Sequence, residues 1–187
     1  MCHVLSSRRR PSKGAKRPYT KGFTLIEMMV TVAVAAIIAG VAVPALRTMV
    51  QNNRQYMQTQ SLWMSLNLAR SESRKRDVSM NVCPSTDGLT CTGSAADWPK
   101  GWIVVATGAA PAMSVPPLAA GSTLSEATPL PAVTFYSNGM VAAAAAFTVC
   151  DSRGASMARS VEVTLAGRVS TSTTPGKRLN GAALACP

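Results

Sequence analysis

The sequence predicts an α+β protein in which one long N-terminal helix precedes a small β-rich domain. The helix is predicted by residues 23–46, which are apolar apart from one acid, and by residues 45–76, which contain no Gly or Pro. The domain is predicted by residues 77–187, where short runs of alternating apolar and polar residues are separated by Gly, Pro and Asn.

Residues 1–22 form a basic leader with seven Lys and Arg and no acid. Because basic residues beside an apolar segment stay on the cytoplasmic side of a membrane, we expect the leader inside and the rest of the chain outside. Without the leader, 12 of the 19 Lys and Arg remain against the eight Asp and Glu, so the net charge falls from +11 to +4. Much of the basicity therefore reflects membrane topology and not nucleic-acid binding.

Residues 23–46 are long enough to cross a membrane. A helix rises about 1.5 Å per residue, so this segment spans a hydrocarbon core of roughly 30 Å. Glu27 is its only charged residue. An ionised carboxylate in hydrocarbon costs about 2.5–3.5 kcal/mol, so Glu27 needs a partner.

Gly22, Phe23, Glu27 and Pro44, in this order and spacing, resemble the type III signal of type IV pilins and pseudopilins. The resemblance implies cleavage after Gly22 by a prepilin peptidase on the cytoplasmic face, and N-methylation of the new Phe23 amine. The apolar segment would stay on the mature protein. Glu27 would meet the N-terminal amine of a neighbouring subunit during assembly.

Other interpretations of the N-terminus explain less. A secretory signal has an apolar core of about 7–15 residues, and this run is too long. Residues 7–10, Ser-Arg-Arg-Arg, hint at a twin-arginine signal, but no short apolar core follows within reach. A plain anchor for an enzyme or a sensor would explain length and orientation, but not Glu27 beside Gly22 and Phe23.

The sequence offers no set of catalytic or metal-binding residues. His3 is the only histidine and lies in the leader, so the mature chain lacks the commonest general base and metal ligand. No G-x-S-x-G elbow, phosphate-binding Gly loop or cluster of metal ligands occurs. We therefore predict that the protein is not an enzyme and needs no cofactor or metal.

Beyond the apolar segment, residues 47–76 are predicted to continue the helix in amphipathic form. Pro44 lacks an N–H, so a kink or local unwinding is expected near residues 40–44. Apolar side chains that recur every seven residues, with others beside them, predict one stripe packed on the domain. They are Met49, Tyr56 and Trp63, with Val50, Met57 and Leu66. The last turn, Arg-Lys-Arg at 74–76, stabilises the negative end of the helix dipole; contact with DNA is the alternative.

Several stretches of the domain are predicted to form strands. They are 78–83, 101–105, 133–136 paired with 140–141 across an Asn-Gly turn, 147–150, and 160–165 turning at Gly167 into 168–170. Residues 107–131 are rich in Pro, Ala, Gly and Ser and are predicted to form a surface loop. A domain of this size can bury one core, and the amphipathic half of the helix would supply one wall of it.

Four cysteines lie outside the leader, and an even set favours disulfides in an oxidising compartment. They are Cys83, Cys91, Cys150 and Cys186, and they allow three pairings. Cys83 and Cys91 flank a turn-forming stretch whose loop would close easily. A bond between Cys150 and Cys186 would hold the C-terminal tail on a strand. A zinc site is the alternative, but the paired C-x₂-C spacing is absent.

The domain also resembles the GspH/FimT group of minor pilins and pseudopilins. The resemblance lies in residues 83–91 (Cys-Pro-Ser-x-Asp-Gly-x-x-Cys), 101–104 (Gly-Trp-Ile-Val), 147–154 (Phe-Thr-Val-Cys-Asp-x-Arg-Gly), 158–159 and 165–169. It implies a type IV pilin-like fold, a helical spine with a β-sandwich-like head, at or near the tip of a type IV pilus or a type II secretion pseudopilus. Implied partners are other pilins or pseudopilins, the prepilin peptidase and an inner-membrane assembly platform, with the head in the periplasm.

Some members of the FimT branch are DNA receptors that use a Gly-Arg-x-Arg motif near the C-terminus. Gly167 and Arg168 match this motif, but Ser170 takes the place of the second Arg. Lys177 and Arg178 lie in a Thr-, Pro- and Gly-containing segment that could reach phosphates, and no aromatic residue accompanies them for base stacking. A receptor for extracellular DNA in natural transformation is therefore the alternative to a purely structural subunit.

Overall fold

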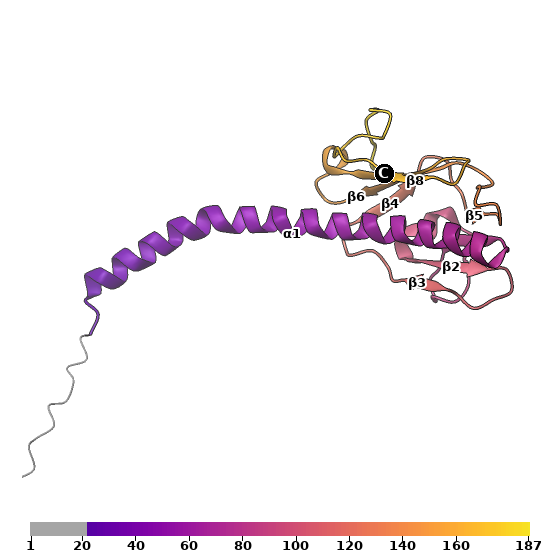
Figure 1. Ribbon diagram of the computed structural model, residues 1–187. Helices are drawn as coiled ribbons and strands as arrows, with labels where there is room; N and C mark the ends of the chain where they lie inside the picture. Colours follow the sequence, from indigo (N-terminus) through magenta and orange to yellow (C-terminus); the bar gives the residue numbers. More distant parts are fainter. Residues whose placement is uncertain (1–21) are drawn as a thin grey trace, which may run out of the picture. The chain divides into compact units, whose positions relative to one another are not determined.

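The computed structural model describes residues 22–187, and Figure 1 shows their course. The predicted leader, with Cys2 and His3, lies outside the described residues apart from Gly22. The chain divides into two compact units, one ending at Pro44 and one starting at Ala45. Each unit is described by itself.

Helix α1 extends from Leu25 to Arg76 and belongs to both units. Its end at Arg76 agrees with the predicted limit of the amphipathic segment. Residues 40–44 are helical throughout, so the local unwinding expected there does not occur; the kink at Pro44 stays a prediction. Pro44 cannot donate a hydrogen bond and its ring crowds the carbonyl of residue 40, but helical geometry continues on both sides of it.

The head consists of two four-stranded antiparallel sheets, ordered β3-β2-β1-β5 and β4-β6-β7-β8 (Figure 1). The strands are β1 (Met80–Pro84), β2 (Trp102–Ala106), β3 (Met113–Val115), β4 (Thr123–Glu126), β5 (Val133–Phe135), β6 (Ala145–Cys150), β7 (Arg159–Val163) and β8 (Val169–Thr171). Two short 3₁₀ helices, η1 (Ala95–Lys100) and η2 (Ala155–Met157), lie between strands. A long N-terminal helix followed by a small head of antiparallel sheets confirms the predicted fold class.

The prediction of a surface loop over residues 107–131 is wrong in part, because this stretch contains β3 and β4. Both are short strands at the edges of their sheets, β3 beside β2 and β4 beside β6. An edge strand of three or four residues needs neither a long alternating pattern nor many β-branched residues. The predicted hairpin is also shorter than expected, since only Phe135 and Val141 form a bridge across its turn.

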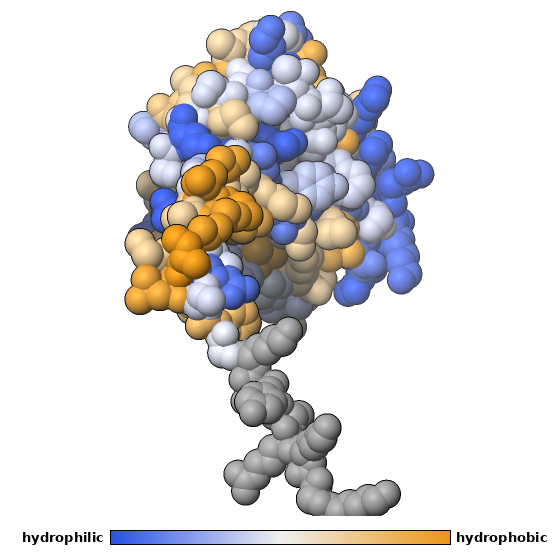
Figure 2. Space-filling model, turned by 90° about the vertical axis from the view of Figure 1, so that its left-hand side faces the viewer, coloured by the Kyte–Doolittle hydropathy of each residue, from blue (hydrophilic) through white to orange (hydrophobic). Residues whose placement is uncertain are grey.

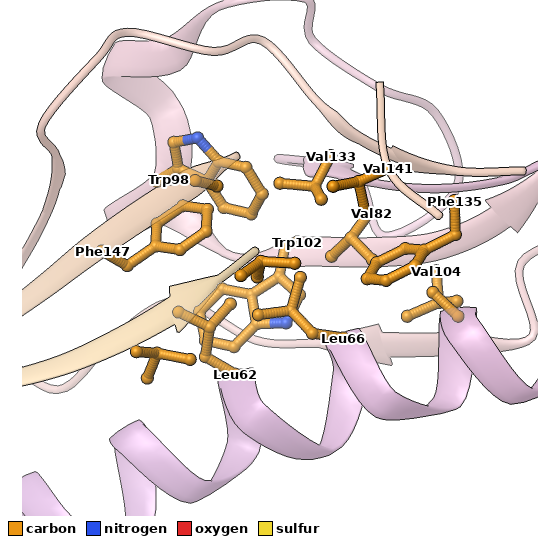
Figure 3. Close-up of a cluster of buried hydrophobic side chains, with 14 of the residues drawn as sticks. Leu62, Leu66, Val82, Trp98, Trp102, Val104, Val133, Phe135, Val141 and Phe147 are labelled. Atoms are coloured by element: carbon orange, nitrogen blue, oxygen red, sulfur yellow. The ribbon is translucent and has the colours of Figure 1, made fainter. Parts of the chain in front are cut away.

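One apolar core joins the two sheets to the second half of α1. Leu62 and Leu66 of the helix point toward Trp102 of β2, with Phe135 and Phe147 nearby (Figure 3). All five side chains are buried. Trp98 of η1 meets Phe147 edge-on at a ring distance of 4.9 Å, an arrangement that aromatic rings prefer. The helix therefore supplies a wall of the core, as predicted.

The predicted helix stripe, however, is not the one that packs on the head. Of its six members only Leu66 is buried, Trp63 is partly buried, and the others are exposed. The exposed members are Met49, Val50, Tyr56 and Met57. The buried face of the helix is Gln55, Thr59, Leu62, Ser65, Leu66, Ala69 and Ser73.

A count of apolar residues does not identify this buried face, because most of its side chains are small or polar. Gln55 Nε2 donates to the Val149 carbonyl over 3.1 Å, and Trp102 Nε1 donates to Ser65 Oγ over 2.9 Å. Such hydrogen bonds remove the cost of burying the polar groups. Met57 and Leu66 are nine residues apart, about half a turn around the helix axis, so they lie on opposite faces.

Candidate functional site

The N-terminal end of α1 carries the predicted processing and assembly residues. Gly22 and Phe23 precede the helix, and the Phe23 side chain is 76% exposed. The Glu27 N–H donates to Thr24 Oγ1 over 3.2 Å, and the Thr24 N–H donates to Glu27 Oε2 over 3.4 Å. Thr24 and Glu27 therefore form the reciprocal capping box of a Thr-x-x-Glu sequence.

Sequence reasoning missed this capping box, although its signature is present in residues 24–27. Glu27 thus has a local role in addition to the predicted one, because it accepts from an N–H at the start of the helix. A backbone N–H is not a countercharge, however. Within residues 22–187, no Lys or Arg pairs with Glu27.

The first half of α1 presents apolar side chains all round. Between Phe23 and Leu46 every residue except Ala42 is exposed. An 18-residue window of α1 has a mean hydropathy of 2.4, and among the described residues this is the one helix long and apolar enough to cross a membrane. Figure 2 looks from the side on which α1 begins and shows apolar side chains, in orange, gathered at the surface.

The second half of α1 also leaves large apolar side chains exposed, and we call this set the exposed stripe. It consists of Met49, Val50, Tyr56, Met57 and Met64, each 46–69% exposed. Val50, Met57 and Met64 are spaced seven residues apart, which places them on one face of the helix. Val50, Met57 and Met64 face away from the buried residues of the helix, whereas the guanidinium of Arg159 lies 5.9 Å from the centre of the Tyr56 ring.

The four cysteines form the disulfides Cys83–Cys91 and Cys150–Cys186. The first closes the turn after β1, and the second ties the C-terminal tail to the end of β6. This is one of the three pairings that the four cysteines allow. The four sulfurs of the zinc alternative are engaged in these two disulfides.

Asp87 organises the first disulfide loop. Its carboxylate accepts from the Leu89 and Thr90 N–H groups and from the hydroxyls of Ser85 and Thr90, at 2.7–2.9 Å. The bonds from Thr90, followed by those from Leu89 and Ser85, hold the pKa of Asp87 far below its usual range. The loop is therefore a fixed feature of the surface.

An ion pair beside the second disulfide anchors α1 to the head. Arg153 pairs with Asp151, and its guanidinium also donates to Asn52 Oδ1 and Gln55 Oε1 of the helix. Burial favours the neutral form of Asp151, but the hydrogen bonds and charge of Arg153 outweigh it, so the pKa of Asp151 is lowered. These residues link the β6–β7 connection to the helix.

The predicted basic residues do not form one continuous motif. Arg168 lies in the turn between β7 and β8, whereas Lys177 and Arg178 lie in the C-terminal tail. In the tail, Lys177 forms an isolated antiparallel β-bridge with Ala183. The turn rests on the end of α1, since Arg70 Nη2 donates to the Ala166 carbonyl over 3.1 Å. Gly167 itself has a packing role, because a Cβ there would lie 1.9 Å from the Gly139 carbonyl oxygen.

Comparisons with known proteins give two sequence matches. A profile described as type II transport protein GspH matches residues 58–167, which is more than half of the chain. A profile described as the prokaryotic N-terminal methylation motif matches residues 17–43. No curated protein matches the chain significantly.

Two solved structures are similar to this chain, and the first of them shares its fold. The minor pilin FimU of the type IV pilus of Pseudomonas aeruginosa is 23% identical, with a TM-score of 0.54 over 66% of this chain and 92% of that one. The minor pseudopilin EpsH of the type 2 secretion system of Vibrio cholerae is 14% identical, with a TM-score of 0.48 over 64% of this chain and 96% of that one.

Proposed function

The chain belongs to the GspH family of minor pilins and pseudopilins, the structural subunits of type IV filaments, and from this premise we propose how it assembles. Prepilin peptidase cuts after Gly22, the Phe23 amine is methylated, and residues 23–46 anchor the protein in the inner membrane. The head, residues 77–187, faces the periplasm. The subunit then enters the filament of a type IV pilus or of a type II secretion system through the inner-membrane assembly platform.

The observation that carries this proposal is the chemistry around Glu27. The carboxylate lies in an apolar segment, accepts from the Thr24 N–H and has no basic partner within residues 22–187. Cleavage after Gly22 preserves the capping box, because both of its bonds join residues 24 and 27. Cleavage also creates a positively charged amine at Phe23. In hydrocarbon, the amine of one subunit and the carboxylate of the next each lack a countercharge until they meet.

The exposed stripe supports the same proposal at the level of the helix. An amphipathic helix on a globular head buries its apolar face, yet this helix leaves five large apolar side chains exposed. Exposed apolar surface of this kind marks a contact with another protein. We assign the exposed stripe to contacts with neighbouring subunits, continuous with those of the membrane segment.

Substitution of Glu27 tests the pairing and separates it from capping. Glu27→Gln keeps an oxygen that can accept from the Thr24 N–H but removes the charge. We expect processing by the peptidase but a strong loss of incorporation into filaments, measured by immunoblots of sheared filaments and of membranes. Mass spectrometry of the mature N-terminus checks the cut before Phe23.

The matched control is Thr24→Ala, which removes the capping hydroxyl and keeps the Glu27 charge. We expect this variant to enter filaments nearly as well as the wild type. If Glu27→Gln assembles normally while Thr24→Ala fails, Glu27 acts as a helix cap and the proposed pairing is wrong. An N-terminus that retains Gly22 would contradict the proposed processing.

A second candidate function is capture of extracellular DNA by the head. It is favoured by the position of the Arg168 turn, which brings that arginine to the end of α1, where Arg70 contacts the same turn. Arg74 lies in this region too, because its side chain packs on Gly139, whose carbonyl contacts Gly167. Arg74 and Arg168 are exposed in this region, whereas Arg70 donates to the Ala166 carbonyl.

Gel retardation of DNA by the full chain in detergent, at two salt concentrations, tests this candidate. Binding that weakens steeply with salt and falls in Arg168→Ala and in Lys177→Ala/Arg178→Ala supports it. Arg54→Ala, on an exposed part of the helix, is the control for loss of one positive charge. If all variants retard DNA equally, or the wild type does not retard it, the DNA-binding candidate is wrong and only the structural role remains.

A further inference from the structure

Glu126, the last residue of β4, holds the crossover between the two sheets. Residues 127–132 connect β4 of one sheet to β5 of the other. Glu126 Oε2 accepts from the Leu130 N–H over 2.8 Å. Leu130 is in turn fixed by Trp98, whose Nε1–H donates to the Leu130 carbonyl over 3.1 Å. The carboxyl, the crossover and the buried indole thus form one hydrogen-bonded chain.

The sequence of the crossover leaves few backbone donors other than the Leu130 N–H that binds Glu126. Leu130 stands between Pro129 and Pro131, and prolines have no N–H to donate. The Leu130 N–H is therefore the one backbone donor in the Pro-Leu-Pro stretch, and Glu126 receives it. At the start of the crossover, the Ala127 N–H still extends the sheet by donating to Ala146 over 3.0 Å. Beyond Ala127, the hydrogen bonds through Glu126 and Trp98 hold the segment.

The second oxygen of the carboxyl is in an unfavourable place. Glu126 Oε1 is buried and has no hydrogen-bond partner among the described residues. A protonated carboxyl tolerates this position, whereas a carboxylate there lacks both water and a donor. Burial, opposed by the Leu130 bond, raises the pKa of Glu126 to about 7.

Few charges face Glu126 from the elements around it. Two hollows flank the residue, of about 410 and 310 Å³. Arg178 lines the second hollow and forms no ion pair with Glu126, and Pro187 lines both hollows. On η1, Asp97 and Lys100 pair with each other over 2.8 Å, and β6 carries no charged residue. The described surroundings therefore offer the ionised carboxylate no close countercharge.

We propose that Glu126 is a proton-operated latch on the β4–β5 crossover. With the carboxyl protonated, residues 127–132 stay closed on Trp98. When the proton leaves, the carboxylate moves to water, the Leu130 bond breaks and the crossover opens. Opening widens the larger hollow, whose walls include Ala95, Pro99 and Pro129. The shape of this face of the head then depends on pH near neutrality, whether or not the proposed filament role holds.

Hydrogen exchange of the full chain in detergent micelles tests the latch. The Leu130 amide and the Trp98 indole N–H are followed by NMR at pH 5.5 and pH 8, and rates are corrected for the intrinsic dependence of exchange on pH. We expect protection of the Leu130 amide to fall by about tenfold at the higher pH, because the closed form binds the proton more tightly than the open form. In Glu126→Gln, which is neutral and keeps the acceptor, protection stays the same at both values.

Glu162→Gln is the matched control. Glu162 Oε1 also accepts from a backbone N–H, that of Leu179, over 3.1 Å, but at an exposed position. This variant is expected to keep the wild-type fall in Leu130 protection. Equal protection of the wild type at both pH values, or the same fall in Glu126→Gln, overturns the latch. A direct ¹³C titration of the Glu126 carboxyl in the wild type needs no variant, and a midpoint near 4.5 would overturn the proposal as well.

Discussion

Arg153 is the residue through which the head holds α1. Its guanidinium satisfies Asp151 and at the same time donates to two amide oxygens of the helix, those of Asn52 and Gln55. The Arg153 and Asp151 side chains are only 18% and 11% exposed. Because water cannot replace a partner easily at such exposures, the loss of one member leaves the other uncompensated.

We therefore predict that Arg153→Met lowers the free energy of unfolding by about 2–4 kcal/mol. Urea unfolding of the full chain in detergent, followed by tryptophan fluorescence, measures the change. Lys100→Met is the control, since it breaks the Lys100–Asp97 pair, in which the lysine is 62% exposed, and should cost less than about 1 kcal/mol. Equal losses in the two variants would contradict the anchoring role of Arg153.

Single residues differ in how far the sequence reveals their roles. The Cys83–Cys91 pair and the Thr-x-x-Glu cap depend on short spacings, so they can be read from neighbouring residues. Arg153 is different, because its partners Asn52 and Gln55 are about a hundred positions away. Glu126 has the same property, since its environment arises from η1, the crossover and the tail together. Contacts of this range follow only from the assembled fold.

Helix α1 shows the same distinction at the scale of an element. Its existence and its end at Arg76 follow from local composition and from the basic last turn. The side that packs on the head does not, because the exposed face carries more large apolar residues than the buried one. Met49, Val50, Tyr56, Met57 and Met64 are exposed, whereas the buried face includes four hydroxyl or amide side chains. A count of apolar residues therefore selects the exposed stripe, which we assign to contacts with neighbouring subunits, and not the face that packs on the head.

Two substitutions on opposite faces of α1 test this assignment. We predict that Leu62→Ala lowers the free energy of unfolding by about 2–5 kcal/mol, because it leaves a cavity beside Trp102 in the core. Met57→Ala should change it by less than about 0.5 kcal/mol, since the side chain is 59% exposed. Met57→Ala should instead reduce incorporation into filaments in sheared fractions. If Met57→Ala lowered the free energy of unfolding more than Leu62→Ala did, the stripe predicted from the sequence would be the face that packs on the head.

The two disulfides are predicted to contribute unequally. Cys150 and Cys186 are 36 positions apart, and Cys83 and Cys91 are eight apart. Because a longer closed loop removes more entropy from the unfolded chain, replacing Cys150 and Cys186 by Ser should cost about 4 kcal/mol. Replacing Cys83 and Cys91 should cost about 2.5 kcal/mol. Urea midpoints and slopes of the two double variants measure the difference, and the opposite order would show that local strain or residual structure dominates.

At the scale of the whole molecule, buried and hydrogen-bonded carboxyls set the dependence of stability on pH. The pKa values of Asp87, Asp97 and Asp151 are lowered from 3.8, so their contributions are present above that value and are lost as the pH falls. Glu126 acts in the opposite direction. Its pKa is raised from 4.5 to about 7, so its contribution is complete below 4.5 and is lost as the pH rises toward 7.

We therefore predict that the full chain is most stable near pH 4–5 and loses stability on both sides of that window. Within residues 22–187 there is no histidine, so the loss between pH 4.5 and 7 belongs mainly to Glu126. Glu126→Gln should flatten this limb of the profile and leave the acid limb unchanged, because Asp87, Asp97 and Asp151 are untouched. Urea unfolding at pH 3, 4.5, 6 and 8 in both proteins measures the profile. A wild-type optimum at neutral pH would mean that the Glu126 carboxyl is hydrated in the folded head, and the closed crossover would then not depend on its proton.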